Sequence, residues 1–260
     1  MTSDCINTLK KYLPLYRELV STDIKLRYRR SFLGYIWSVL NPLLVMSIMV
    51  FVFSHMFRFN IDNYPVYLII GQTLWNFMNE ATTRSEWSIL GNANLLKKTY
   101  VPKYIFVLST VSSVFVNMLF SLAAMVIVFI VCGIHISWNL LFLPVILVQT
   151  FIFTTGMSFF LAQGCVFFRD IQYIYNAVLT AWMYATPIFY PFDQLPALLQ
   201  TIVKWLNPMY SYITQFRVIA LQGIFPDWKL IAIGMFWAFF FLLFGVYRFW
   251  HNQDRFILYI

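Results

Sequence analysis

The sequence predicts an all-α integral membrane protein with six transmembrane helices, an N-terminal amphipathic interfacial helix, and re-entrant helices before the last span. Of its 260 residues, 61% are hydrophobic and only 11% are charged, whereas a soluble domain carries about 25% charged residues. Aromatic residues make up 20% of the chain. A soluble fold could not bury that much apolar surface, and a disordered chain would be richer in charge and poorer in aromatic residues.

Residues 1–34 are predicted to form a cytosolic or interfacial amphipathic segment. Its apolar residues, among them Tyr12, Leu13, Tyr16 and Leu19, recur at helical spacing. A basic amphipathic helix ahead of a span typically lies in the membrane interface, and the alternative is a helix solvated by the cytosol. The basic side chains of the segment are Lys10, Lys11, Arg17, Lys25, Arg27, Arg29 and Arg30.

Residues 35–260 are predicted to form a single six-span domain, because a spanning helix needs roughly 20 apolar residues. We expect the first three spans at 35–59, 64–87 and 104–132. The second is unusually polar toward its end. There Arg84 follows Glu80 by four residues, so the two charges can neutralise each other on one helix face.

The remaining spans are expected at 140–168, 171–190 and 230–249. Before the last of them, the chain mixes prolines with two apolar runs, 195–206 and 209–221. Runs of that length are too short to cross a bilayer, so we expect re-entrant or interfacial helices.

The basic residues indicate the orientation of the chain, because cytoplasmic loops are enriched in Lys and Arg. With the N-terminus inside, the seven Lys/Arg of the first segment and seven more are cytosolic, out of 18 in all. We therefore expect a multi-pass protein of the cytoplasmic membrane with both termini in the cytosol. Cys132 and Cys165 then lie near opposite membrane faces, which argues against a disulfide between them.

Several kinds of chemistry have no motif in this sequence. The nine glycines include no phosphate-binding loop of the Gly-x-x-x-x-Gly-Lys-Ser/Thr type, and no His-Glu-x-x-His or Cys-x-x-Cys occurs. His55, His135 and His251 lie far apart in the sequence. We therefore expect no catalytic residues, no metal site and no cofactor in this chain. If the chain moves a substrate uphill, its energy source lies elsewhere.

The stretch 22–43, with a basic run leading into Leu33-Gly34, Trp37 and Asn41-Pro42, resembles the start of the ABC-2-type polysaccharide exporter permeases. Weaker similarities follow in the expected order. Asn94–Pro102 resembles the first cytosolic loop of that family, and Phe168-Arg169-Asp170 resembles the turn between its fourth and fifth spans. Asn207-Pro208 falls in the region expected to be re-entrant.

This resemblance implies a permease subunit that exports a lipid-linked polysaccharide, of the O-antigen or wall teichoic acid type, across the cytoplasmic membrane. It implies a homodimer bound to two copies of a separate ATPase subunit, which would hold ATP and Mg²⁺. The glycan would pass between the two permease copies. Membrane lipids are further expected partners. Binding of nucleic acid is not expected.

Aromatic rings are candidates for the glycan path, because sugars present C–H faces that pack well on them. In the fifth span Tyr175, Trp182 and Phe189 are seven residues apart, which predicts one helix face. Tyr173 and Tyr184 form a second stripe, and Trp37 and Phe51 are the candidates in the first span. Packing in the bundle or against lipid is the alternative for all of these rings.

Two polar groups are further candidates. Lys25, Arg27, Arg29 and Arg30 could hold anionic lipid head groups or the pyrophosphate of the carrier at an entrance, or serve only as a positive-inside anchor. The polar breaks on the cytosolic face are either ATPase-coupling elements or ordinary loops. Their candidate residues are Asn94, Leu95, Leu96, Lys97, Pro102, Arg169 and Asp170.

Two other functions compete with glycan export. An ABC-2 exporter of small molecules or lipids would have the same architecture. An integral membrane transferase would need a carboxylate or histidine constellation at a membrane face, and the sequence offers none that is convincing.

Overall fold

The computed structural model describes residues 2–29, 33–53, 61, 63–135 and 137–259, and in these residues every regular element is helical. The all-α part of the predicted fold class is therefore confirmed. The α-helices in these residues are α1 (Thr2–Tyr28), α2 (Trp37–Val52), α3 (Tyr64–Glu86), α4 (Ala93–Lys98), α5 (Tyr104–Val131), α6 (Leu143–Phe167), α7 (Ile171–Ala185), α8 (Ala197–Leu206), α9 (Pro208–Arg217) and α10 (Trp228–Asn252). Short 3-10 segments (Gly34–Ile36, Leu90–Asn92, Trp138–Phe142, Phe192–Gln194 and Gln253–Leu258) and a π-helical segment (Val218–Gln222) flank them.

Four helical stretches of the described residues are long and apolar enough to cross a membrane: Gly34–Val52, Tyr104–Val131, Trp138–Phe167 and Trp228–Leu258. They coincide with four of the six predicted spans. The predicted span at 64–87 is also a helix, α3, but its polar residues keep it out of this set. Of the first predicted span, residues 54–59 lie outside the described residues.

The predicted fifth span, 171–190, is wrong at its C-terminal end, because α7 stops at Ala185. Thr186 adopts an extended conformation, and the residue before a proline is biased away from the helical region by clashes with the proline ring. Pro187 therefore ends the helix, and α7 has only 15 residues.

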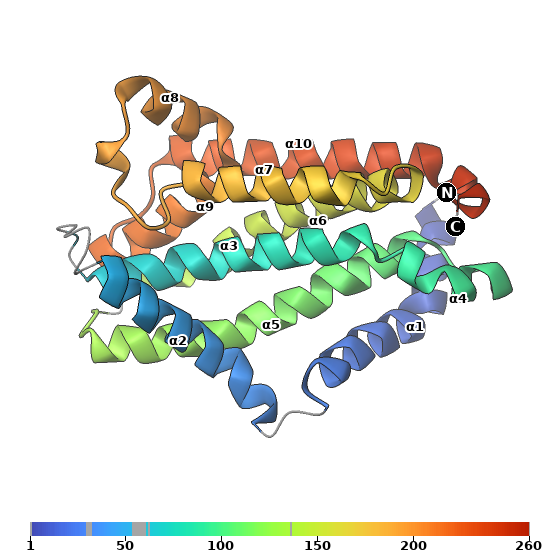
Figure 1. Ribbon diagram of the computed structural model, residues 1–260, viewed down its shortest axis with the longest axis horizontal. Coiled ribbons are helices and arrows are strands. Elements are labelled where there is room, and N and C mark those ends of the chain that lie inside the picture. The colour runs from blue at the N-terminus through green and yellow to red at the C-terminus, as the bar shows by residue number, and fades with distance from the viewer. Residues whose placement is uncertain (1, 30–32, 54–60, 62, 136, 260) are drawn as a thin grey trace.

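α3 is the central helix of the bundle. It packs against α2, α5, α6, α7 and α9, and Figure 1 shows it between α2 and α7. Its apolar side chains fill the main core, where Leu68, Ile70, Leu74 and Met78 are completely buried. A helix with this many neighbours can carry polar residues, because other helices shield it from lipid.

α6 and α10 make the closest helix pair. A Cβ atom on Gly156 would collide with the backbone of Phe241 and Leu242, and one on Gly245 would collide with the backbone of Gly156. Small residues at such a crossing let two membrane helices approach closely, which gives extensive van der Waals contact. The seam formed by Gly156 and Gly245 therefore joins α6 and α10 without room for any side chain.

The two ends of the bundle differ. At one end, α8 projects away from the long helices (Figure 1), whereas α9 is almost entirely buried against α3 and α10. The two short apolar runs at 195–206 and 209–221 thus form short helices, as expected, with bounds Ala197–Leu206 for α8 and Pro208–Arg217 for α9. At the other end, the start of α1 lies near the end of α10 (Figure 1). A second apolar core forms there around Leu96, Phe106, Phe249 and Phe256.

The predicted N-terminal amphipathic helix is present as α1, and its apolar face packs on α5. The Tyr16 hydroxyl donates a hydrogen bond to Ser112 Oγ at 2.6 Å, and the Tyr12 hydroxyl donates to the Tyr100 carbonyl at 3.3 Å. This face therefore contacts the bundle, with Leu13 left exposed beside it.

Candidate functional site

The predicted stripe of Tyr175, Trp182 and Phe189 is not one helix face. Phe189 lies beyond the end of α7, where it is buried and its ring stacks on Phe53 with a centroid separation of 5.4 Å. Tyr175 is buried and its hydroxyl donates to Thr82 Oγ1 of α3 at 2.9 Å. These contacts place two of the three rings inside the packed bundle.

Trp182 is half-buried and tied to the segment before α9. Its Nε1 donates to Asn207 Oδ1 at 2.9 Å, and Asn207 Nδ2 donates to Thr186 Oγ1 at 2.8 Å. The indole stands edge-on to Trp75 of α3, 5.8 Å between ring centroids. In this chain Trp182 therefore has the contacts of a packing residue.

The second predicted stripe lies on the exposed face of α7. Tyr173 is 70% exposed and Tyr184 is 62% exposed. Asn176 and Thr180 lie between them and are also exposed, so the four side chains follow one another at helical spacing of three and four residues. We call these four residues the α7 polar face. Sequence reasoning found its two tyrosines and missed Asn176 and Thr180, which the same spacing could have revealed.

The exposed face of α2 contains both aromatic candidates of the first span. Trp37 and Phe51 lie on it together with Asn41, Leu44 and Ile48. Their spacing alternates between four and three residues, which is the pattern of a helix that packs along a second helix. We call this row the α2 seam.

A polar hollow of about 590 Å³ lies between α2, α3 and α5. On α3 it is lined by Asn76, Asn79 and Glu80, which share one face of the helix. The rest of its lining is Arg27, Trp37, Ser38, Asn41, Pro42, Val45, Asn117 and Ser121. The sequence showed α3 to be polar toward its end. α2 and α5 also place polar groups against this face of α3. This is a feature of the tertiary structure, and no local sequence pattern predicts it.

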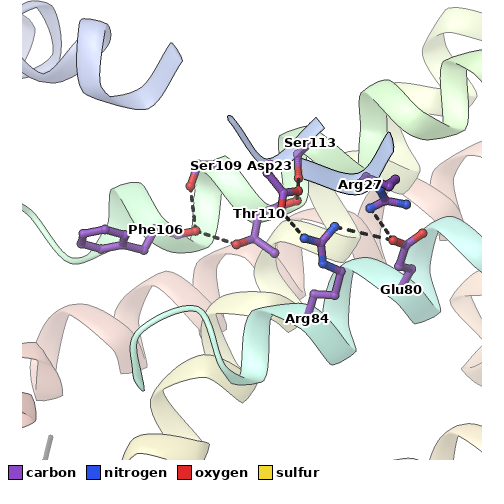
Figure 2. Close-up of polar contacts among 8 residues, drawn as sticks. All are labelled: Asp23, Arg27, Glu80, Arg84, Phe106, Ser109, Thr110 and Ser113. Carbon is purple, nitrogen blue, oxygen red and sulfur yellow. Dashed lines mark hydrogen bonds and ion pairs between the residues drawn. The ribbon is translucent and has the colours of Figure 1, made fainter. Parts of the chain in front are cut away.

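Four charged residues form a network at the edge of the hollow, and Figure 2 shows them with Ser113. Arg27 of α1 contacts Glu80 of α3 at 2.5 Å, and Glu80 also contacts Arg84 at 3.6 Å. Arg84 pairs in turn with Asp23 of α1. The predicted pairing of Glu80 with Arg84 is therefore confirmed, and it extends to α1.

Ser113 extends the network to a third helix, because its hydroxyl on α5 donates to Asp23 Oδ2 at 2.5 Å. The basic residues predicted at an entrance therefore differ from one another. Arg27 is held in an ion pair, whereas Lys25 and Arg29 are exposed. Arg30 lies outside the described residues.

The predicted coupling residues near α4 sit on an anchored surface. Leu96 is buried in the second core, Leu95 packs against it, and Asn94 and Lys97 point outward. Pro102 lines a groove of about 460 Å³ whose other walls come from α1 and the C-terminal segment, including Lys11, Trp250 and Asp254.

Lys103 forms part of the same groove, and its Nζ donates to the Gln253 carbonyl at 2.5 Å. Burial lowers the pKa of Lys103, against the opposing effect of nearby Asp254. The groove therefore joins the start of α5 to the C-terminal segment.

Arg169 and Asp170 are exposed at the turn between α6 and α7. The first turn of α7 is held to the end of α3, because Trp87 Nε1 donates to Gln172 Oε1 at 3.1 Å. A displacement of this turn would therefore act on both α7 and α3.

Sequence reasoning missed the role of Arg217, which is one of the four basic residues not assigned to the cytosolic side. Arg217 is buried, and its guanidinium donates to the carbonyls of Tyr67, Pro187 and Ile188 at 2.7–3.2 Å. It also lies 3.3 Å above the centroid of the Tyr67 ring. Its partners are remote in sequence, so no local pattern could have predicted these contacts.

Among the described residues, no group of three or more His, Cys, Asp or Glu side chains could hold a metal ion. Cys132 and Cys165 are free thiols. The described helices, four of them apolar and long enough to span a bilayer, define a multi-pass membrane protein.

The chain belongs to the ABC-2 type transporter family, whose family model matches residues 14–221. This confirms the resemblance found in the sequence motifs. The chain is 31% identical over 223 residues to an O-antigen export system permease protein of Myxococcus xanthus, which covers 85% of this chain and 86% of that protein. It is 34% identical over 206 residues to a protein of the same description from Klebsiella pneumoniae, covering 79% of each chain.

Proposed function

We propose that this chain is the permease subunit of an ABC transporter that exports a lipid-linked polysaccharide, of the O-antigen or teichoic acid type, across the cytoplasmic membrane. The names of its relatives support this substrate class. The observation that carries the proposal is the α7 polar face, because it combines exposed tyrosines with exposed polar groups on a helix of a membrane bundle.

Physical chemistry gives this face only two stable surroundings. The Thr180 hydroxyl donates to the Asn176 carbonyl at 3.0 Å, whereas the Asn176 side-chain amide has no partner among the described residues. An unpartnered amide in a membrane helix usually faces a bundle interior or a water-filled cavity. The rings of Tyr173 and Tyr184 can pack against the C–H faces of sugars. A hydrated path for a glycan satisfies both kinds of group.

The proposed topology has six spans: α2, α3, α5, α6, α7 and α10. The polar α3 is shielded by its neighbours, and the short α7 is continued toward the outer face by the segment that leads to Phe189. In this topology α8 and α9 are the re-entrant or interfacial helices of the outer face. Both termini are cytosolic, residues 1–34 form the interfacial segment, and residues 35–260 form one domain.

We further propose that two copies of the chain form a homodimer around the path. The α2 seam supports this arrangement, since its alternating spacing is typical of a helix that packs along a second helix, and symmetric dimers are the commonest oligomers. Leu44, Ile48 and Phe51 would then lie where the two copies meet, and Trp37 would lie at the edge of that contact, where it also lines the polar hollow.

ATP hydrolysis is assigned to two copies of a separate ATPase subunit, which would bind ATP and Mg²⁺, so this chain is not itself an enzyme. The docking residues proposed for that subunit are on α4 and the following loop (Asn94, Leu95, Leu96, Lys97 and Pro102) and at the turn of Arg169 and Asp170. The exposed Lys25 and Arg29 remain candidates for binding anionic head groups, together with Arg30.

The proposal is tested by replacing both exposed tyrosines of α7, Tyr173→Ala and Tyr184→Ala, in cells that make the glycan. We expect glycan at the cell surface to fall at least tenfold while the amount of the protein in the membrane is unchanged, because neither ring is buried. Tyr247→Ala is the matched control, since Tyr247 is equally exposed but lies on α10. Normal surface glycan in the double variant would contradict the proposed path.

A further inference from the structure

The polar hollow is separate from the α7 polar face. It is an open hollow lined by α1, α2, α3 and α5 of a single copy, and none of its lining residues comes from α7. A smaller recess of about 40 Å³ adjoins it, shares Asn76, Asn117 and Ser121, and extends the polar lining to Gln72 and Thr73. Figure 1 shows α1 and α2 diverging on this side of the bundle.

Three side-chain amides of the hollow have no partner in the described part of the chain: Asn41, Asn76 and Asn79. Asn76 is exposed near the midpoint of α3. An amide that faces hydrocarbon without a hydrogen bond is costly. The amides are therefore available to a polar ligand, and each offers both donors and an acceptor.

The charge of the lining favours an uncharged ligand. Arg27 and Glu80 are the charged residues that line the hollow, and they contact each other at 2.5 Å. The remaining polar lining consists of amides and hydroxyls. Such a surface suits hydroxyl groups, which donate and accept hydrogen bonds, better than it suits a phosphate.

Trp37 adds the apolar part of the recognition. Its indole is 41% exposed and lines the hollow beside Asn41 and Ser38. An indole next to several amides is a combination suited to a sugar ring, whose C–H face packs on the aromatic surface while its hydroxyls reach the amides.

We propose that the polar hollow binds a sugar ring of the transported glycan within one copy of the chain, apart from the path along α7. This inference rests on the proposed function, because it takes the glycan as the substrate. Each copy of a dimer would then hold one such site.

The first test is photo-crosslinking in cells that make the glycan, with Trp37 replaced by p-benzoylphenylalanine in the full transporter. We expect a glycan adduct of the chain, detected as a mass ladder that disappears in cells lacking the first glycosyltransferase. The same replacement at Phe236, exposed on α10, is the control and should give no ladder. Adducts at position 37 only to lipid, or only to a second copy of the chain, would overturn the inference.

A third crosslinking position separates this inference from the proposed function. If the replacement at Tyr173 captures glycan and the replacement at Trp37 does not, the hollow is not a sugar site and the proposed function stands. If neither position captures glycan, the proposed function fails as well.

The second test measures export by the double variant Asn76→Leu and Asn79→Leu. Leucine is close to asparagine in size and suits a membrane helix, so the protein should still insert and assemble. Losing two amides that bind sugar hydroxyls should reduce the export rate about tenfold. Thr83→Val is the matched control one turn further along α3, outside the lining of the hollow. Equal export by the double variant and the control would contradict the inference.

Discussion

The α6–α10 seam and the polar hollow are opposite ways of joining membrane helices. At the seam two glycines bring the backbones into contact, and a single added Cβ atom would collide with the partner helix. At the hollow, α2 stands off from α3 and α5 around a space of about 590 Å³ lined by amides and hydroxyls.

The difference shows which parts of the bundle are fixed and which are adaptable. Lipid tails are as apolar as leucine, so membrane helices associate through van der Waals packing, and close contact gives the strongest association. The seam therefore provides a rigid frame. The hollow gives up that packing, and its polar lining is stable only when it is hydrated or occupied.

The largest effect is expected from Gly156→Leu, which would force α6 and α10 apart. Overpacking a well-packed site typically costs about 1–3 kcal/mol and occasionally more. Here the obstacle is the backbone of Phe241 and Leu242, which cannot move aside, so we expect a cost above that range and above the cost of the next variant. We expect the variant to be degraded or to lose its thermal transition in detergent. Gly91→Ala is the control, because nothing lies near a Cβ at that position. A normal melting temperature for Gly156→Leu would show that the seam is looser than described.

A smaller loss of stability is expected from Trp182→Ala. Replacing a packed aromatic residue by alanine costs about 3–5 kcal/mol, and the half-buried Trp182 should fall at the lower end of that range. Asn207 also loses a hydrogen-bond donor. Thermal unfolding of the purified protein measures the effect, with Trp228→Ala as the exposed control. If Trp182→Ala stopped export at unchanged stability, the ring would belong to the path after all.

The smallest effect on stability is expected at the edge of the hollow, from the pair of Arg27 and Glu80. Their side chains are 22% and 36% exposed, and partly exposed ion pairs typically contribute about 0.2–1 kcal/mol. A double-mutant cycle with Arg27→Met and Glu80→Gln should therefore give a coupling energy in that range, and 1 M salt should reduce it. A coupling energy of several kcal/mol would mean that this edge of the hollow is as rigid as the α6–α10 seam.

The fold followed from the sequence wherever the length of an apolar run decided it. The helices α5, α6 and α10 begin and end within a few residues of the predicted spans, because a long apolar run flanked by polar residues has few alternatives in a bilayer. The end of α7 was missed, although Pro187 was visible. The apolar run continues to Phe189 and concealed the break.

The candidate site was harder to predict, because it depends on which face of a helix is buried. Both predicted aromatic stripes have helical spacing in the sequence, and only the packing of Tyr175 and Leu179 against the bundle shows that Tyr173 and Tyr184 are the exposed pair. The hollow combines α3 with helices from other parts of the chain, and Arg217 binds carbonyls 29 to 150 residues away in the sequence. Periodicity within one helix carries no information about such contacts.

The contacts of Arg217 couple α7 and α9, so that the two helices would move together. The guanidinium grips the two carbonyls that follow the end of α7, and Asn207 holds Trp182 and Thr186 from the other side. A helix of this length spans roughly 22 Å, so a tilt imposed at the turn of Arg169 and Asp170 would be carried along α7 to α9 at the opposite end of the bundle. The same guanidinium also donates to the Tyr67 carbonyl in the first turn of α3. The tilt of α7 and α9 would therefore take place about this turn of α3.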